Sequence, residues 1–196
     1  MSYIRDIKNK IRESYRQKRR ELAPSLKQTF DERIVRHFTS LASYRFSDIL
    51  LAYYPLADEV DIRPLMEDAL AAGKRVALPR CRPEGAEMEF YFISSLDELT
   101  KGRYGIPEPG PECERFDRAS GAPSMIVIPA LVYDRFGYRL GYGRGYYDRY
   151  VGEYRGVKAG LCYNAFVRSA PLPRGRFDIA VDYIVTEKGV RLIEKA

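Results

Sequence analysis

ILLAYYP, at residues 49–55, is the stretch of this sequence that decides the fold. A short apolar run without polar alternation is typical of a strand whose two faces are both covered by other elements. RVALP at 75–79 and the start of SMIVIPALVY at 124–133 are runs of the same kind, and MEFYFI at 88–93 and VKAGLCY at 157–163 predict further strands. Helical patterns lie between them. We therefore expect an α/β layered fold with a largely parallel central sheet.

The remaining segments complete this outline. Residues 4–22 repeat apolar side chains at helical spacing on a basic helix, and a second helix is expected to start with a capping box at Ser25. A third helix is predicted within 61–74, and residues 181–196 predict a final strand and helix. Since no repeat or long linker divides the chain, we expect residues 1–196 to form a single domain.

The composition excludes several classes of protein. The apolar runs are too short to cross a bilayer, and the charged start of the chain has no apolar secretory core, so we expect no membrane partner. Three cysteines without CxxC spacing favour reduced thiols over a disulfide framework or a zinc site, which indicates a cytoplasmic protein. The single histidine, His37, has no partner in the sequence pattern, so serine–histidine chemistry lacks support.

The charge balance favours an anionic partner. With 33 Lys and Arg against 27 Asp and Glu, the formal net charge is +6. An excess of this size suits nucleic acid and polyanionic small molecules equally, so the charge alone does not choose between them.

The glycine-rich stretch RLGYGRGYYDR, at residues 139–149, carries the most chemistry. Its three alternate glycines let main-chain N–H groups approach a ligand closely, and its arginines could neutralise a phosphate. Asp148 is unexpected in a pure anion site, but it is suited to hold a Mg²⁺ ion that bridges to phosphates. The spacing matches neither common nucleotide-binding signature, so a structural tight turn remains the alternative. The position after a predicted strand favours the ligand site.

Other candidates follow the predicted strands, where α/β sheets bind ligands. Tyr54 and Tyr147 could stack on a flat heterocycle, although most of the 16 tyrosines must serve packing. Glu59 could hydrogen-bond a polar ring, and Arg80 could contact a phosphate; a surface role is the alternative for both. Asp178 and Asp182 have turn or capping roles as their default interpretation.

Five blocks of the sequence, together with the basic amino-terminal helix, resemble the 5-formyltetrahydrofolate cyclo-ligase family over nearly the whole chain. The blocks are RLGYGRGYYDR (139–149), YYPLADEVDIRPL (53–65), GKRVALPR (73–80), RYGIPEP (103–109) and VDYIVTE (181–187). The resemblance implies an ATP- and Mg²⁺-dependent enzyme with a three-layer α-β-α fold, in which the central sheet is largely parallel and Rossmann-like. Such an enzyme converts 5-formyltetrahydrofolate to 5,10-methenyltetrahydrofolate and releases ADP and phosphate. We expect these two small-molecule substrates, no nucleic acid partner and a monomer.

The resemblance also implies roles for residues. Arg144 and Tyr147 are the expected catalytic residues, and Asp148 and Asp182 are the expected Mg²⁺ ligands. Tyr54, Glu59 and Tyr147 are implied folate contacts, to which the position of Arg80 at a strand end adds a phosphate or substrate contact. The implied ATP contacts are Lys8, Arg12, Arg139, Gly141, Gly143, Arg144, Gly145, Tyr146 and Tyr147.

The chain departs from the family pattern in three places. Position 144 is arginine where members often carry glycine or lysine, Tyr133 stands where phenylalanine is commoner, and the loop at 163–166 lacks a frequent glutamine. Two alternatives stay open: a diverged relative without this activity, and a basic nucleic-acid-binding module in which arginine alternates with tyrosine. The aspartate inside the basic loop favours the enzyme, because it would repel a nucleic acid backbone.

Overall fold

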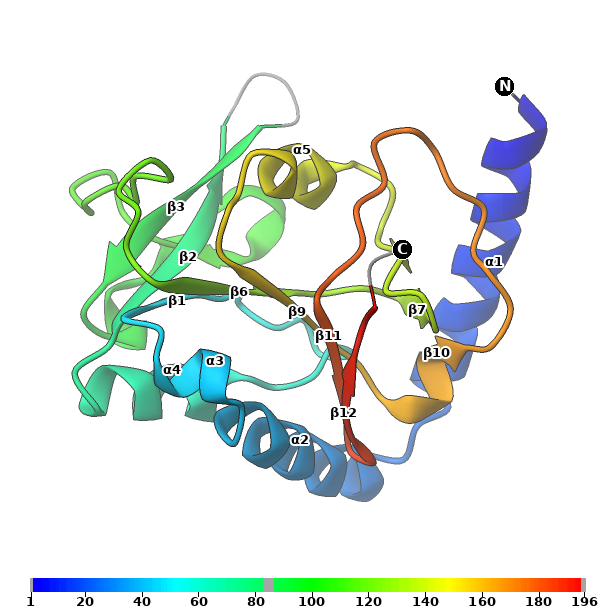
Figure 1. Ribbon diagram of the computed structural model, residues 1–196, viewed down its shortest axis with the longest axis horizontal. Coiled ribbons are helices and arrows are strands. Elements are labelled where there is room, and N and C mark those ends of the chain that lie inside the picture. The colour runs from blue at the N-terminus through cyan, green and yellow to red at the C-terminus, as the bar shows by residue number, and fades with distance from the viewer. Residues whose placement is uncertain (1, 83–86, 195–196) are drawn as a thin grey trace.

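The computed structural model describes residues 2–82 and 87–194 (Figure 1). The helices are α1 (Ser2–Arg20), α2 (Pro24–Thr39), α3 (Ala42–Arg45), α4 (Arg63–Ala71) and α5 (Tyr146–Gly152). The longer strands are β1 (Ile49–Leu51), β2 (Arg75–Cys81), β3 (Met88–Ile93), β6 (Ser124–Ile128), β9 (Val157–Leu161), β11 (Tyr183–Thr186) and β12 (Gly189–Leu192). The shorter strands are β4 (Thr100–Lys101), β5 (Pro107–Glu108), β7 (Val132–Asp134), β8 (Arg139–Leu140) and β10 (Val167–Arg168).

The central sheet has seven strands in the order β12-β11-β9-β6-β1-β2-β3. β1 pairs in parallel with both β2 and β6, and β9 pairs in parallel with β6 and β11. Only the edge strands β3 and β12 run antiparallel to their neighbours. The expectation of a largely parallel sheet is therefore confirmed. Since β2 lies on one side of β1 and β6 on the other, strand addition changes direction at β1, which is where such sheets bind ligands.

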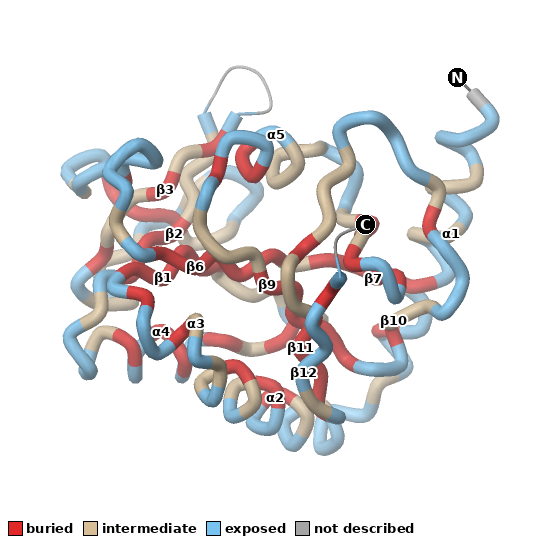
Figure 2. The backbone as a smooth tube through the Cα atoms, viewed as in Figure 1, coloured by how far each residue is buried: buried red, intermediate tan, exposed pale blue. Residues whose placement is uncertain are grey.

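Both faces of the sheet are covered, which explains the unbroken apolar runs. In β1, the side chain of Leu50 joins a core with α2 and α4, whereas Ile49 and Leu51 join a second core with residues of α5. Figure 2 shows buried backbone running through the adjacent central strands. Burying one such aliphatic side chain stabilises the fold by about 1.5–3 kcal/mol. The predicted three-layer α-β-α architecture is thus confirmed (Figure 1).

Helix α1 lies at one side of the molecule, near β7 and β10 (Figure 1). Lys8, Arg12, Tyr15 and Arg19 follow one another at intervals of four, three and four residues, which places them on one face of the helix. Tyr15 anchors this face, because its ring packs edge-on against the ring of Phe166 with centroids 6.0 Å apart.

Two local predictions were wrong. The capping box at Ser25 does not form: α2 starts after Ala23, which makes no side-chain cap, with a proline in its first turn. Proline suits that position because the first N–H groups of a helix have no partner within it. The predicted carboxyl-terminal helix is replaced, in the described residues, by the β11–β12 hairpin, in which Gly189, the first residue of β12, has φ 134°. No helix in the described parts of the chain is long and apolar enough to cross a membrane.

Candidate active site

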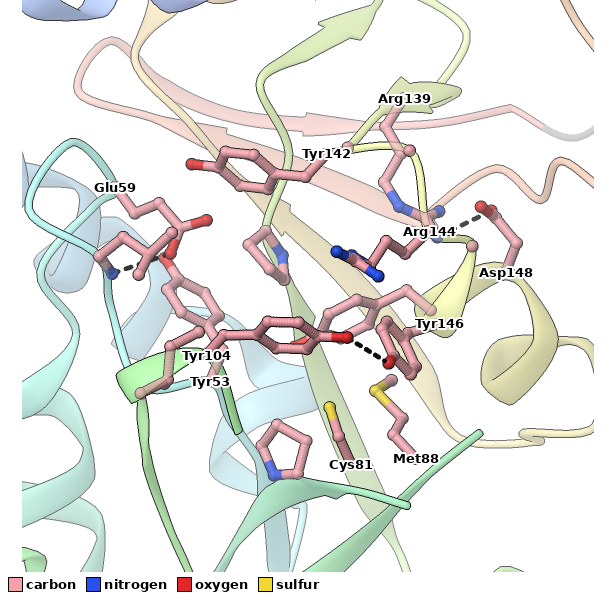
Figure 3. Close-up of a pocket in the computed structure, with 18 of the residues that line it drawn as sticks. Tyr53, Glu59, Cys81, Met88, Tyr104, Arg139, Tyr142, Arg144, Tyr146 and Asp148 are labelled. Atoms are coloured by element: carbon pink, nitrogen blue, oxygen red, sulfur yellow. Dashed lines mark hydrogen bonds and ion pairs between the residues drawn. The ribbon is translucent and has the colours of Figure 1, made fainter. Parts of the chain in front are cut away.

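A cavity of about 470 Å³ opens at the carboxyl ends of β1, β2 and β6 (Figure 3). Residues just after β1, at the end of β2 and just after β6 contribute to its walls, as do α1 and the glycine-rich loop 141–145. The cavity thus lies where the order of the strands predicts a ligand site.

The glycine-rich loop, residues 141–145, connects β8 to α5. Gly143 has φ 100° and Gly145 has φ 72°, a left-handed conformation that other residues adopt only with strain. The main-chain oxygen of Gly141 accepts a hydrogen bond of 2.9 Å from Nε of Arg12. A Cβ at Gly143 would lie 3.3 Å from the Arg12 guanidinium carbon. The loop is therefore fitted closely against α1.

Arg139 and Asp148 form an ion pair at one end of the cavity. The Arg139 side chain is 4% exposed and donates from Nη2 to Oδ1 of Asp148 at 2.8 Å. Its Nη1 donates to the main-chain oxygen of Ile179 at 3.2 Å, which fixes the orientation of the guanidinium. The carboxylate of Asp148 is 29% exposed and lines the cavity, so it is held in place yet accessible to a ligand.

The side chain of Arg144 reaches from the same end toward the middle of the cavity (Figure 3). Its guanidinium carbon lies 4.7 Å from the ring centroid of Tyr104, a cation–π contact. The hydroxyl of Tyr104 lies 3.2 Å from that of Tyr146, and this hydrogen bond raises the pKa of Tyr146 to about 12. Tyr104 itself has φ 65°, the only non-glycine residue with positive φ in the described chain.

Lys8 reaches the same region from α1. Its Nζ lies 2.7 Å from Oδ2 of Asp178, and both side chains are largely buried. Both residues line the cavity, so the loop before β11 takes part in the site.

Glu59 lies at the opposite end of the cavity from Arg144 and Asp148 (Figure 3). It is 5% exposed, and its Oε2 accepts a hydrogen bond of 3.0 Å from the main-chain N–H of Leu56. Burial raises the pKa of this carboxyl group to about 7. Burial also raises the pKa of the neighbouring Tyr147 phenol, which therefore stays protonated at neutral pH.

The structure brings most of the predicted site residues together. Two lie outside the lining of the cavity: Arg80 donates from Nη1 to the oxygen of Gly110 at 2.7 Å, and Oδ2 of Asp182 accepts from the N–H of Lys158 at 2.7 Å. The predicted residues that do line it are Lys8, Arg12, Tyr54, Glu59, Arg139, Gly141, Gly143, Arg144, Gly145, Tyr146, Tyr147 and Asp148.

The residues that line the cavity include several to which the sequence analysis assigned no individual role: Tyr53, Cys81, Tyr104, Glu108, Tyr142 and Asp178. Tyr104 lies in RYGIPEP and Tyr142 lies between two of the loop glycines, so both stood in stretches that already carried a signal. Asp178 was given a turn or capping role, because its pairing with Lys8, which joins residues 170 positions apart, is not visible in the sequence.

Comparisons with known proteins point to one family. The model of the 5-formyltetrahydrofolate cyclo-ligase family matches residues 4–187. The chain is 27% identical to 5-formyltetrahydrofolate cyclo-ligase of Escherichia coli strain K12, over 89% of this chain and 97% of the relative. It is 26% identical to the mitochondrial 5-formyltetrahydrofolate cyclo-ligase of Arabidopsis thaliana, over 93% of this chain and 75% of the relative.

Two solved structures share the fold. The 5,10-methenyltetrahydrofolate synthetase of Aquifex aeolicus superposes with a TM-score of 0.84 at 35% identity, covering 97% of this chain and 94% of the other. The 5,10-methenyltetrahydrofolate synthetase of Mycoplasma pneumoniae superposes with a TM-score of 0.73 at 22% identity, covering 92% and 98%.

Proposed function

The chain belongs to the 5-formyltetrahydrofolate cyclo-ligase family, and on that premise we propose that it converts 5-formyltetrahydrofolate to 5,10-methenyltetrahydrofolate at the expense of ATP. The observation that carries this proposal is a single cavity with arginines at one end and a buried carboxyl group at the other. We call the first the nucleotide end, because it suits a triphosphate, and the second the folate end, because it suits a polar heterocycle.

In the proposed reaction the oxygen of the N5-formyl group attacks the γ-phosphorus of ATP. The bond from that phosphorus to the bridging oxygen breaks, and ADP leaves. N10 of the folate then attacks the activated carbon, the carbon–oxygen bond breaks, inorganic phosphate leaves, and N10 loses its proton. Such a phosphoryl transfer depends on positioning and charge neutralisation more than on covalent catalysis by the protein.

The nucleotide end of the cavity supplies the positive charge that neutralises the phosphates. In our proposal Lys8, Arg12 and Arg144 bind the phosphates, and Arg144 counters the charge on the transferred phosphoryl group. The glycine-rich loop brings its main chain close to the nucleotide, because it has no side chains at 141, 143 and 145. Arg139 acts one step removed, since its guanidinium is engaged by Asp148.

The donor set fits one magnesium ion only together with the nucleotide. No group of three or more His, Cys, Asp or Glu side chains in residues 2–82 and 87–194 could hold a metal. Mg²⁺ commonly takes one or two carboxylates and completes its shell with phosphates and water, so Asp148 on the cavity wall is sufficient. When bound there, the ion would neutralise phosphate charge. Asp182, which the family resemblance also implies, lies outside the cavity lining.

In our proposal the folate end of the cavity recognises the pterin ring through Glu59. We assign Glu59, in its ionised form, to accept hydrogen bonds from the N–H groups on the edge of the pterin ring, and Tyr54, which also lines the cavity, to contact the ring. The phenol of Tyr147 stays protonated and can donate to the formyl oxygen. Burial around Glu59 excludes competing water, so a correctly paired ring gains more than it would at the surface.

The test is a spectrophotometric assay of the purified protein with 5-formyltetrahydrofolate, ATP and Mg²⁺. We expect the absorbance of the methenyl product to appear, with one ADP formed for each product molecule. A folded protein that binds both substrates and forms no product would be a diverged relative without this activity, and the proposal would fail.

A further inference from the structure

Arg19, in the last turn of α1, is a buried cation beside the folate end of the cavity. It is 5% exposed. Its Nη1 donates to the main-chain oxygen of Asp58 at 2.7 Å, its Nε donates to that of Leu131 at 3.4 Å, and its Nη2 donates to that of Ala130. Arginine alone among side chains offers this many donors in one rigid fork. The guanidinium therefore ties α1 to the segments that follow β1 and β6.

The carboxylate of Asp58, in the segment after β1, connects Arg19 to the glycine-rich loop. Oδ2 of Asp58 lies 4.0 Å from Nη1 of Arg19. The other carboxylate oxygen, Oδ1, accepts a hydrogen bond of 3.3 Å from the hydroxyl of Tyr142 in the glycine-rich loop. Asp58 immediately precedes Glu59, so the group that fixes the main chain of Asp58 also fixes the starting point of the Glu59 side chain.

We propose that Arg19 is a positioning residue for the folate site: it holds the Asp58–Glu59 segment at the cavity wall and, through Asp58 and Tyr142, aligns that segment with the glycine-rich loop. This inference rests on the proposed function for the identity of the ligand. Arg19 does not line the cavity and does not touch the reacting atoms, so its effect is exerted through Glu59.

The electrostatic surroundings of Glu59 support this role. Arg19 and Lys27 are the cations that lower the pKa of Glu59 against the larger effect of burial, which raises it, and Asp58 raises it further. The charged and titratable side chains that face Glu59 from the surrounding elements are Arg19, Lys27, Asp58, Tyr53, Tyr142 and Tyr147. In addition, the Tyr163 hydroxyl lies 3.3 Å from the main-chain oxygen of Glu59. Of the two cations, Arg19 lies on α1 and makes the direct contact with the adjoining residue.

Two substitutions separate the charge of Arg19 from its fork of donors. Arg19→Lys keeps the positive charge but cannot reach three carbonyl oxygens at once, and Arg19→Met removes both. Arg20→Met is the matched control, because Arg20 is the next residue of the same turn and is exposed. Each variant is assayed for KM of both substrates, for the pH dependence of the folate KM and for amide hydrogen exchange of residues 56–60.

We expect Arg19→Met to raise the folate KM by about 10- to 100-fold, since charge-assisted hydrogen bonds are lost, with the ATP KM changed by less than about 3-fold. In this variant the fall of the folate KM with rising pH should also occur at a higher pH than in the wild type, because the pKa of Glu59 rises when the neighbouring cation is lost. Arg19→Lys should restore the pH profile but only part of the KM. Exchange of residues 56–60 should accelerate in both variants and stay unchanged in Arg20→Met.

An equal rise of both KM values with an unshifted pH profile would overturn the proposal, because it would show that Arg19 only anchors α1. Unchanged exchange at 56–60 in a folded Arg19 variant would overturn it as well. If Arg19→Met does not fold, Arg19→Lys carries the KM and exchange tests alone. Hydrogen exchange needs no substrate, so failure of this inference is distinguishable from failure of the proposed function, which the wild-type protein tests.

Discussion

The two ends of the cavity differ in how their charges are held. At the nucleotide end Arg144 is exposed and Asp148 is partly exposed, so their charges are solvated before any ligand arrives. At the folate end Glu59 is 5% exposed, and burial holds its pKa near neutrality. The first end is suited to attract a polyanion through charges that are already formed. The second recognises its ligand by pairing a buried group, so protons and substitutions should affect the two ends in different ways.

The largest expected effect lies at the nucleotide end. Asp148→Asn removes the carboxylate proposed for Mg²⁺ and weakens the pairing of the buried Arg139. We expect kcat/KM for Mg·ATP to fall on the order of 10²- to 10³-fold, the range seen when a preorganised electrostatic group is lost. The folate affinity, measured by calorimetry without nucleotide, should change by less than about 2-fold, because Asp148 lies at the opposite end of the cavity from Glu59.

The control for this variant is Glu153→Gln, which follows α5 and pairs with Arg118 on the surface. It should leave both substrates unaffected, since an exposed ion pair contributes little. Full turnover of Asp148→Asn at limiting Mg²⁺ would show that the two ends do not divide the work as proposed.

The next effect isolates the folate end. Glu59→Gln keeps the shape of the side chain but turns one acceptor oxygen into a donor, which faces the donors of the pterin edge. We expect the folate KM to rise about 10- to 100-fold, as for an unpaired buried polar contact, and the ATP KM to stay nearly constant. In the wild type, folate affinity should weaken as pH falls below about 7, where Glu59 becomes protonated. A pH-independent folate affinity would contradict the assignment of the ionised form.

The same substitution has an opposite effect on stability. The folded-state pKa of about 7 lies above the ordinary value of 4.5, so the folded state binds more protons between these values. Stability of the wild type therefore falls as pH rises from about 4.5 to 7, and the full cost remains above 7. Glu59→Gln should stabilise the protein at pH 8 by up to about 3 kcal/mol and have little effect at pH 4, as measured by denaturant unfolding. Equal effects at both pH values would rule out the buried ionised carboxylate as the cause.

A smaller effect is expected at Arg144, which is exposed and whose guanidinium makes a cation–π contact with the ring of Tyr104. Arg144→Ala should raise the ATP KM about 10-fold at low ionic strength and also lower kcat, because Arg144 is proposed to counter charge on the transferred phosphoryl group. The difference in KM should shrink with added salt, since exposed charges are screened. Arg144→Lys is the matched variant and should recover most of the affinity. A change confined to the folate KM would place Arg144 at the other end of the cavity.

How far the sequence predicts the molecule follows from the same contrast. The apolar runs at 49–55 and 124–133 predict the central strands because a strand buried on both faces has apolar residues at consecutive positions. The signal of the glycine-rich stretch at 139–149 is likewise local, since its glycines and arginines lie within eleven residues. The carboxyl-terminal helix was predicted wrongly because the sequence of residues 190–196 also satisfies a helical pattern, whereas pairing with β11 decides the strand conformation of Gly189–Leu192.

The parts of the site that the sequence did not reveal depend on distant contacts. Arg19 is one of several cations in a basic helix until the fold places it against a carbonyl 39 positions away. Tyr142 joins Asp58 across 84 positions. Burial of Glu59, which sets its pKa, is also a tertiary property, because a glutamate after a strand is exposed by default.

The smallest expected effect concerns Asp178, whose carboxylate lies 2.7 Å from Nζ of Lys8. Asp178 is an acid among the cavity-lining cations, so it competes with phosphate for Lys8 and repels the incoming anion. Asp178→Asn removes this competition, and we expect ATP affinity to increase by about 2- to 5-fold, within the range of a partly solvent-screened ion pair. Isothermal titration with a non-hydrolysable ATP analogue measures this change, and the increase should shrink as salt is raised. Lys8→Met is the matched loss of the cation. Weaker nucleotide binding in Asp178→Asn would mean that Asp178 positions Lys8 for the phosphates and that the nucleotide end, like the folate end, depends on a fixed partner rather than on free charge.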